Sequence, residues 1–171
     1  MTIIAAYMDD DHVVIGCDSM ASTTYVKYEA GTKLIDRLGN YSIGLAGSCR
    51  VFDILLEDSE LPNTMRDIQS VRALRDRVIE LTKDLKNAEF NLVIASPFGI
   101  AGIESDHSID FIPHDYFAAG TEEELALGSM FNSRKMDDPA ALAVETAVQA
   151  AVQYSTHCGF DIHIKTYERI K

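Results

Sequence analysis

The pattern of apolar and polar residues changes its period several times along the chain, and these changes predict the elements. Runs rich in apolar and β-branched residues occupy 2–7 and 12–18, and a polar turn separates them, which is typical of a β-hairpin. Two further short strands are predicted at 33–37 and 41–46, with Gly39-Asn40 as the turn between them. The first part of the chain therefore predicts antiparallel strands.

Helical periodicity begins after Ser48. Apolar residues recur at helical spacing and predict helices over 48–61, 71–85, 121–132 and 138–154. Acidic residues in the first turn of the third helix match the helix dipole, and the proline after Asp138 suits a helix start. Strand-like runs lie between and after the helix pairs, at 90–95, 99–103, 108–112 and 160–167.

The order of the elements predicts the class of fold. Strands are followed by two helices, more strands, two more helices and a last strand. Hairpin-linked strands favour antiparallel sheets, and helices that arrive in pairs suggest a layer on the outer face of each sheet. We therefore expect an α+β fold, with residues 1–171 forming a single domain without repeats.

Composition narrows the classes of function. The net charge of -12 argues against a nucleic-acid-binding surface, which needs clustered lysine and arginine. The three cysteines lack motif spacing and fit a reducing compartment. The sequence has no signal-peptide pattern and no apolar run of membrane-spanning length. We therefore expect a cytoplasmic protein with no membrane partner.

Candidate chemistry lies at the ends of the predicted strands. If Met1 is removed, Thr2 carries a hydroxyl and a free α-amine, which are a nucleophile and a base on one residue. Asp18, Lys33 and Gly47 each stand beside the end of a short strand and could complete a site. Each residue alone has a plainer explanation as a turn residue or a surface charge. Together, in this order, they favour an active site.

These residues resemble the proteasome β-subunits and the bacterial HslV-type peptidases. The likeness lies in Lys33 and in residues 2–5, 16–22, 44–48, 119–121 and 126–128. The resemblance implies an N-terminal-nucleophile hydrolase with a four-layer αββα sandwich, usually assembled into rings. It also implies that the Thr2 hydroxyl attacks a peptide carbonyl, that Asp18 holds Lys33 in place, and that the Gly47 N–H faces the oxyanion.

The implied role of Lys33 can be given a magnitude. An unperturbed α-amine has a pKa of ~7.7–8.0. An ammonium about 4 Å away would contribute on the order of 4 kcal/mol of repulsion at an effective dielectric near 20. Half of that would lower the pKa of the Thr2 amine by about 1.5, which leaves it unprotonated at neutral pH.

The resemblance suggests supporting and substrate-binding residues as well. Thr121 stands where family members often carry a serine, and its hydroxyl could support the Thr2 amine. Proteasome β-subunits have a supporting aspartate near the C-terminus, for which Ser155 is the best match, and the bacterial relatives also lack that aspartate. The first specificity pocket would be formed by small or apolar residues and favour an apolar substrate side chain; these residues are Ala21, Gly31, Leu45 and Cys49.

Two alternatives keep the same fold: an amidase for small amides, and an inactive structural ring subunit. A homo-oligomeric ring is expected because the helices after Gly47 and Asp138 are apolar on more than one face, and an ATPase unfoldase is a potential partner. Residues 9–12 could form a metal site, but a charged hairpin tip is the favoured interpretation. The histidines lack zinc-ligand spacing, so neither a metal nor a cofactor is expected.

Overall fold

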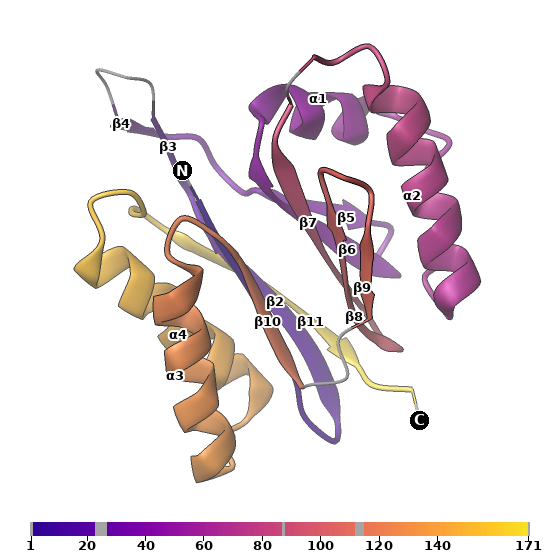
Figure 1. The fold of residues 1–171 in the computed structure, drawn as a ribbon. Coiled ribbons are helices and arrows are strands. Elements are labelled where there is room, and N and C mark those ends of the chain that lie inside the picture. The colour runs from indigo at the N-terminus through magenta and orange to yellow at the C-terminus, as the bar shows by residue number, and fades with distance from the viewer. Residues whose placement is uncertain (1, 23–26, 87, 112–114, 171) are drawn as a thin grey trace.

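Two antiparallel β-sheets lie face to face in the computed structural model, which describes residues 2–22, 27–86, 88–111 and 115–170 (Figure 1). Within these residues, one sheet has the strand order β10-β1-β2-β11 and the other has the order β5-β6-β7-β8-β9. The first sheet consists of β1 (Ile3–Met8), β2 (His12–Asp18), β10 (Tyr116–Gly120) and β11 (Ile162–Glu168). The second consists of β5 (Leu34–Arg37), β6 (Tyr41–Gly47), β7 (Phe90–Ser96), β8 (Gly99–Glu104) and β9 (Ile109–Phe111).

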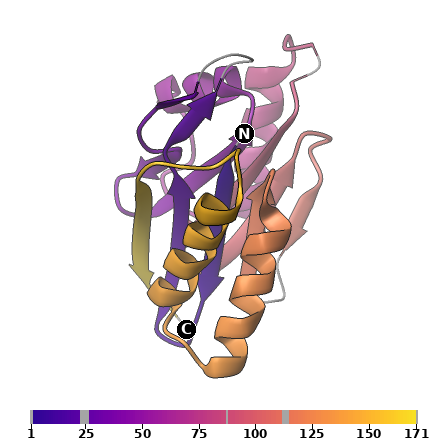
Figure 2. The same cartoon turned by 90° about the vertical axis from the view of Figure 1, so that its left-hand side faces the viewer.

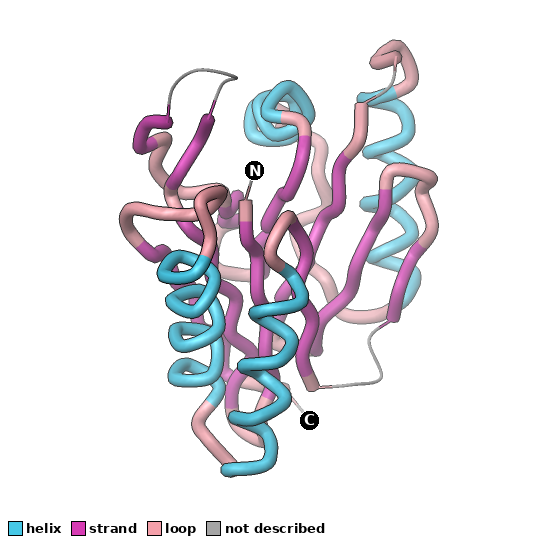
Figure 3. Tube along the Cα trace, turned by 60° about the vertical axis from the view of Figure 1, so that its left-hand side comes forward, coloured by secondary structure: helices cyan, strands magenta, loops and turns pink. Residues whose placement is uncertain are grey.

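A pair of helices covers the outer face of each sheet. The helices α1 (Cys49–Glu57) and α2 (Ile68–Thr82) pack on the five-stranded sheet. The helices α3 (Glu123–Met136) and α4 (Ala140–Tyr154) pack on the four-stranded sheet. Figure 2 shows α3 and α4 in front of the four-stranded sheet, and Figure 3 shows the strands between the two helix pairs. The expected four-layer αββα sandwich is confirmed.

The strand β1 shows why the sequence specifies buried sheets. Successive side chains of a strand point to opposite faces. Ile3 and Ala5 pack against α3 and α4, whereas Ile4 and Ala6 pack against the facing sheet. Because both faces are covered, the strand is apolar throughout rather than alternating. This packing fixes the position of the residue that precedes β1.

The predicted helices are all present, with ends that differ by a few residues. Helix α1 ends at Glu57 rather than near Leu61, and α3 runs from Glu123 to Met136 rather than over 121–132. The turn between β5 and β6 is centred on Leu38 and Gly39, both with positive φ, rather than on Gly39-Asn40. The predicted strand 108–112 is shorter, and Ile112 lies outside the described residues. No described helix is long and apolar enough to cross a membrane.

Three strands were not predicted. A small hairpin of β3 (Met20–Ser22) and β4 (Lys27–Glu29) stands beside the start of β1, and β10 forms an edge of the four-stranded sheet. All three residues of β4 are exposed, so no alternation of burial marks it. Such short strands are specified by their partners rather than by their own pattern.

The acidic hairpin tip between β1 and β2 is structural. The Asp9 carboxylate accepts hydrogen bonds from the backbone N–H groups of Asp11 (2.8 Å) and His12 (2.6 Å). It also accepts one from the N–H of Ala140 at the start of α4 (2.8 Å), so the hairpin caps that helix. The interpretation of residues 9–12 as a charged hairpin tip agrees with these bonds.

Candidate active site at the start of the first strand

Thr2 lies directly before β1, at the end of the sandwich marked N in Figure 1, and its residue is only 7% exposed. Its carbonyl oxygen accepts a hydrogen bond from the N–H of Thr121 (3.0 Å). Gly120 has a φ of 126°, and a Cβ at that position would collide with the Thr2 carbonyl. The end of β10 therefore holds Thr2 through close backbone contact.

Asp18 ends β2 and is completely buried beside this point. Its Oδ1 accepts hydrogen bonds from the N–H of Ile3 (3.1 Å) and from Nζ of Lys33 (2.6 Å). Its Oδ2 accepts from the N–H groups of Met20 (3.3 Å) and Gly159 (3.2 Å). One carboxylate thus joins Lys33 to the residue that follows Thr2. A buried charge is tolerated when it is paired and hydrogen-bonded in this way.

Lys33 lies immediately before β5, and its side chain is 12% exposed. Its backbone N–H donates to the Cys17 sulfur (3.4 Å). This bond holds the Lys33 backbone in place, and with it the base of the side chain that ends in the ammonium. Lys33 and Thr2 line the same cavity. The predicted association of Lys33 with Asp18 is therefore present, and it places a cation beside the cavity that Thr2 enters.

Gly47 ends β6 with a φ of 123°, a conformation that favours glycine. A Cβ at Gly47 would collide with the backbone of Glu89, so only glycine fits without displacing β7. The next N–H, that of Ser48, donates to the Glu89 carbonyl (3.0 Å). Gly47 lies close to Thr2, because both residues line both of the cavities at this end.

Two cavities meet at Thr2 and Gly47. One, of about 310 Å³, is otherwise lined by Met20, Ala21, Tyr28, Ala30, Thr32, Lys33, Leu45, Cys49, Phe52 and Asp53. The other, of about 500 Å³, is otherwise lined by Ala46, Glu89, Phe90, Asn91, Ser105, Gly120 and Thr121. The first contains three of the four residues predicted to bind substrate; Gly31 is not in its lining, although both of its neighbours are.

Ser155 lies at the C-terminal end of α4 and contacts Glu122, the residue after Thr121. Its hydroxyl donates a hydrogen bond to the Glu122 carboxylate (2.5 Å) and accepts one from the N–H of His157 (2.8 Å). No hydrogen bond joins Ser155 directly to Thr2 among the described residues. From the sequence Glu122 was interpreted as part of a first helical turn that could make the site acidic, and its bond to Ser155 was not predicted.

Neither buried thiol competes with Thr2 as a nucleophile. Burial raises the pKa of Cys158 to about 12, and the negative charge of Asp18 acts in the same direction. Burial also raises the pKa of Cys17. Because the thiolate is the reactive form, both sulfurs are inert at neutral pH. Neither of these two sulfurs lines the cavities that Thr2 lines.

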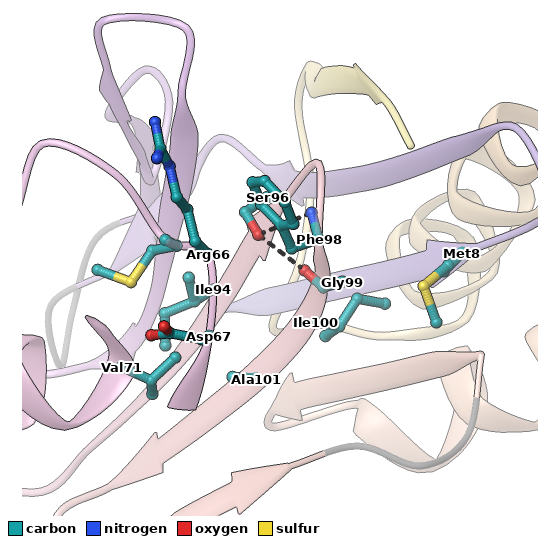
Figure 4. A pocket seen from close by; sticks show the side chains of 11 residues that line it. Met8, Arg66, Asp67, Val71, Ile94, Ser96, Phe98, Gly99, Ile100 and Ala101 are labelled. Carbon is teal, nitrogen blue, oxygen red and sulfur yellow. Dashed lines mark hydrogen bonds between the residues drawn. The ribbon is translucent and has the colours of Figure 1, made fainter. Parts of the chain in front are cut away.

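A further cavity, of about 170 Å³, lies at the other end of β1 beside Met8 (Figure 4). The Ser96 hydroxyl there accepts from the N–H of Phe98 (3.2 Å) and donates to the Gly99 carbonyl (3.4 Å). The Asp67 carboxylate accepts from the N–H of Ser70 (2.9 Å) and so caps α2. Ser96 and Asp67 are therefore engaged in a turn and in a helix cap, which are structural roles.

The αββα sandwich is the N-terminal-nucleophile hydrolase fold, which the HslV and proteasome-type peptidase structures share. A structure of Thiobacillus denitrificans BPH in complex with epoxomicin is similar, with a TM-score of 0.85 and 18% identity over 99% of this chain and 100% of that one. Another structure of Thiobacillus denitrificans BPH has a TM-score of 0.82 and 18% identity, covering 97% of each chain. Eukaryotic HslV from Trypanosoma brucei has a TM-score of 0.78 and 19% identity, covering 98% of this chain and 99% of that one. No protein-family model matches the sequence, and no curated protein matches it.

Proposed function

We propose that this protein is a peptidase whose nucleophile is the hydroxyl of Thr2. The observation that carries the proposal is the buried Asp18 carboxylate, which bonds both Lys33 and the N–H of Ile3. This pair holds the Lys33 ammonium, at 2.6 Å from a fully buried aspartate, beside the cavity that Thr2 lines. The expected removal of Met1 is part of the proposal, since Met1 lies outside the described residues.

The proposed reaction has two stages. The Thr2 Oγ adds to the peptide carbonyl while the Thr2 amine takes the hydroxyl proton, and the Gly47 N–H donates to the oxyanion. The C–N bond then breaks, the proton passes to the leaving amine, and an acyl-ester stays on Thr2. Water adds to this ester by the same route and releases the second product. The Lys33 ammonium keeps the amine unprotonated through repulsion.

Covalent labelling tests the nucleophile. A peptide epoxyketone offers a ketone and an epoxide to a residue that has both a hydroxyl and a free amine. The wild-type protein is expected to be labelled at Thr2, Thr2→Ser to be labelled more slowly, and Thr2→Ala not at all. Thr166→Ala, at an exposed position on β11, is the matched control and should be labelled like the wild type. Peptide mapping by mass spectrometry locates the adduct, and equal labelling of Thr2→Ala would contradict the proposal.

Intact mass separates the inactive alternative from the active one. Protein isolated from its own host is expected to be lighter than the encoded chain by one methionine residue. Retained Met1 would block the amine and favour a structural subunit of the same fold. Activity on small amides, with none on unfolded proteins, would favour the amidase instead.

The proposal includes assembly into a homo-oligomeric ring, which an ATPase unfoldase could serve. Large apolar side chains are exposed on the outer helices; they include Leu56, Ile68, Ile79, Leu125, Phe131 and Leu142. These side chains are available for burial against neighbouring subunits. Sedimentation at micromolar concentration is expected to give an oligomer, and a clean monomer of 18.9 kDa would contradict the ring.

A further inference from the structure

We propose that Glu122 is a second charged residue that controls the Thr2 amine, and that its carboxylate stabilises the protonated amine against the opposing effect of Lys33. The inference rests on the proposed peptidase function and adds a residue that sets the pH at which the site becomes active. It starts from a carboxylate that stands at the beginning of a helix and does not cap it.

Glu122 occupies the N-cap position of α3, where a side-chain oxygen usually accepts a hydrogen bond from one of the first N–H groups of the helix. The Glu122 side chain forms no such bond. Its backbone carbonyl accepts from the N–H of Ala126 (3.3 Å), so the helix begins through the main chain alone. The carboxylate is directed elsewhere.

The Glu122 carboxylate accepts a hydrogen bond from the Ser155 hydroxyl (2.5 Å), which belongs to the end of α4. The Ser155 hydroxyl is itself fixed, because it accepts from the N–H of His157 (2.8 Å). Two residues further on, the N–H of Gly159 donates to Oδ2 of Asp18 (3.2 Å). The segment after α4 thus contacts the half-buried Glu122 carboxylate at one end and the buried Asp18 carboxylate at the other.

The main chain also brings Glu122 close to Thr2. The residue before Glu122 donates its N–H to the Thr2 carbonyl (3.0 Å). Burial raises the pKa of the neighbouring Cys158 thiol to about 12. The charges of Asp18 and Glu122 act in the same direction, whereas the charge of Lys33 lowers the pKa of this thiol. The three charges therefore meet in one region, at the end of the sandwich that holds Thr2.

Charges of opposite sign have opposite effects on the amine. A cation favours the unprotonated amine by repulsion, and an anion favours the ammonium by attraction. Lys33 approaches from the residue before β5, and Glu122 approaches from the residue before α3. The pKa of the Thr2 amine is therefore set by a balance, and removal of either charge should shift it in a different direction.

Other titratable groups also surround Thr2. They are Asp53 and Glu89 in the two cavities, Asp18 at the end of β2, Glu123 and Glu124 in the first turn of α3, and His157 and Cys158 after α4. Asp53, Glu89 and Glu124 are exposed, so water and salt screen their charges. Asp18 is bonded to Lys33 and acts through it. Glu122 is half-buried and hydrogen-bonded, so its charge is held in one place.

The test measures the rate constant of Thr2 labelling by a peptide epoxyketone as a function of pH. Glu122→Gln keeps an acceptor for the Ser155 hydroxyl and removes the charge, and thermal unfolding checks that the fold is unchanged. Without the anion, the pKa of the Thr2 amine should fall. The acid limb of the labelling profile should therefore move toward acid pH by about half a unit, the size expected of a partly exposed charge. Labelling on that limb should become about threefold faster, and Lys33→Ala should move the same limb in the opposite direction.

Glu124→Gln is the matched control, because it removes one negative charge from an exposed position in the first turn of the same helix. It should leave the acid limb in place. An acid limb that stays in place in Glu122→Gln, moves toward alkaline pH, or moves equally in Glu124→Gln would overturn this inference alone. Absence of Thr2-dependent labelling of the wild type would overturn the peptidase function and this inference with it.

Discussion

Lys33→Ala is expected to lower kcat/KM by at least about a hundredfold, the size of a lost general base. Without the ammonium, the pKa of the Thr2 amine should rise, so the amine stays protonated to higher pH. The acid limb of the pH profile of kcat/KM should therefore move toward alkaline pH, by roughly 1.5 pH units for an ammonium assumed to stand about 4 Å from the amine. A merely structural lysine would not move this limb.

The same substitution leaves Asp18 buried without its cation. Removal of one partner of a buried ion pair costs roughly 3–5 kcal/mol of unfolding free energy. The thermal unfolding of Lys33→Ala must therefore be measured as well. The rates of the variant and the wild type are then compared at a temperature below the unfolding midpoint of the variant. Lys33→Arg should rescue poorly, because a planar guanidinium does not occupy the position of the ammonium. Lys165→Ala, which breaks an exposed pair with Asp36, is the control. Near-normal turnover of Lys33→Ala would show that the lysine has no part in the reaction.

Gly120→Ala is expected to remove epoxyketone labelling and to destabilise the fold. The φ of 126° is a conformation that side chains rarely adopt, and the added Cβ would collide with the Thr2 carbonyl. A strained backbone position costs about 1–3 kcal/mol, before the displacement of Thr2 is counted. The change therefore acts on stability and on the position of the nucleophile together.

Gly128→Ala provides the matched comparison. Gly128 lies within α3, and a Cβ there would contact nothing within 4 Å. Alanine in a helix interior is favoured over glycine by about 1 kcal/mol, so this variant should unfold at a higher temperature and be labelled like the wild type. If Gly120→Ala were labelled normally, the close contact between Gly120 and Thr2 would not control the site.

The sequence was sufficient for the elements whose own pattern is strong. Strands such as β1 and helices such as α2 carry their periodicity in consecutive residues, and Asp18 and Gly47 stand at the ends of such strands. The hairpin of β3 and β4 has no comparable pattern, since β4 is exposed throughout. Its position, where it lines one cavity together with α1, is set by tertiary contacts rather than by its own sequence pattern.

The positions and partners of three acidic residues near Thr2 could not be predicted from the sequence, for one reason. Asp53, Glu89 and Glu122 come from α1, from the residue before β7 and from the residue before α3, and only folding brings these segments together near Thr2. In a linear sequence each is an ordinary acidic residue near a helix or strand end. Their chemistry depends on neighbours that lie far away in the chain.

The four hydrogen bonds of Asp18 also set an order of events during synthesis. They come from Ile3, Met20, Lys33 and Gly159, so the carboxylate receives its last partner from a segment translated long after the first three. A nascent chain can contain Thr2, Asp18 and Lys33 and still lack the environment that holds the buried charge. The full set of hydrogen bonds around Asp18 is therefore complete only once the segment that contains Gly159 has docked.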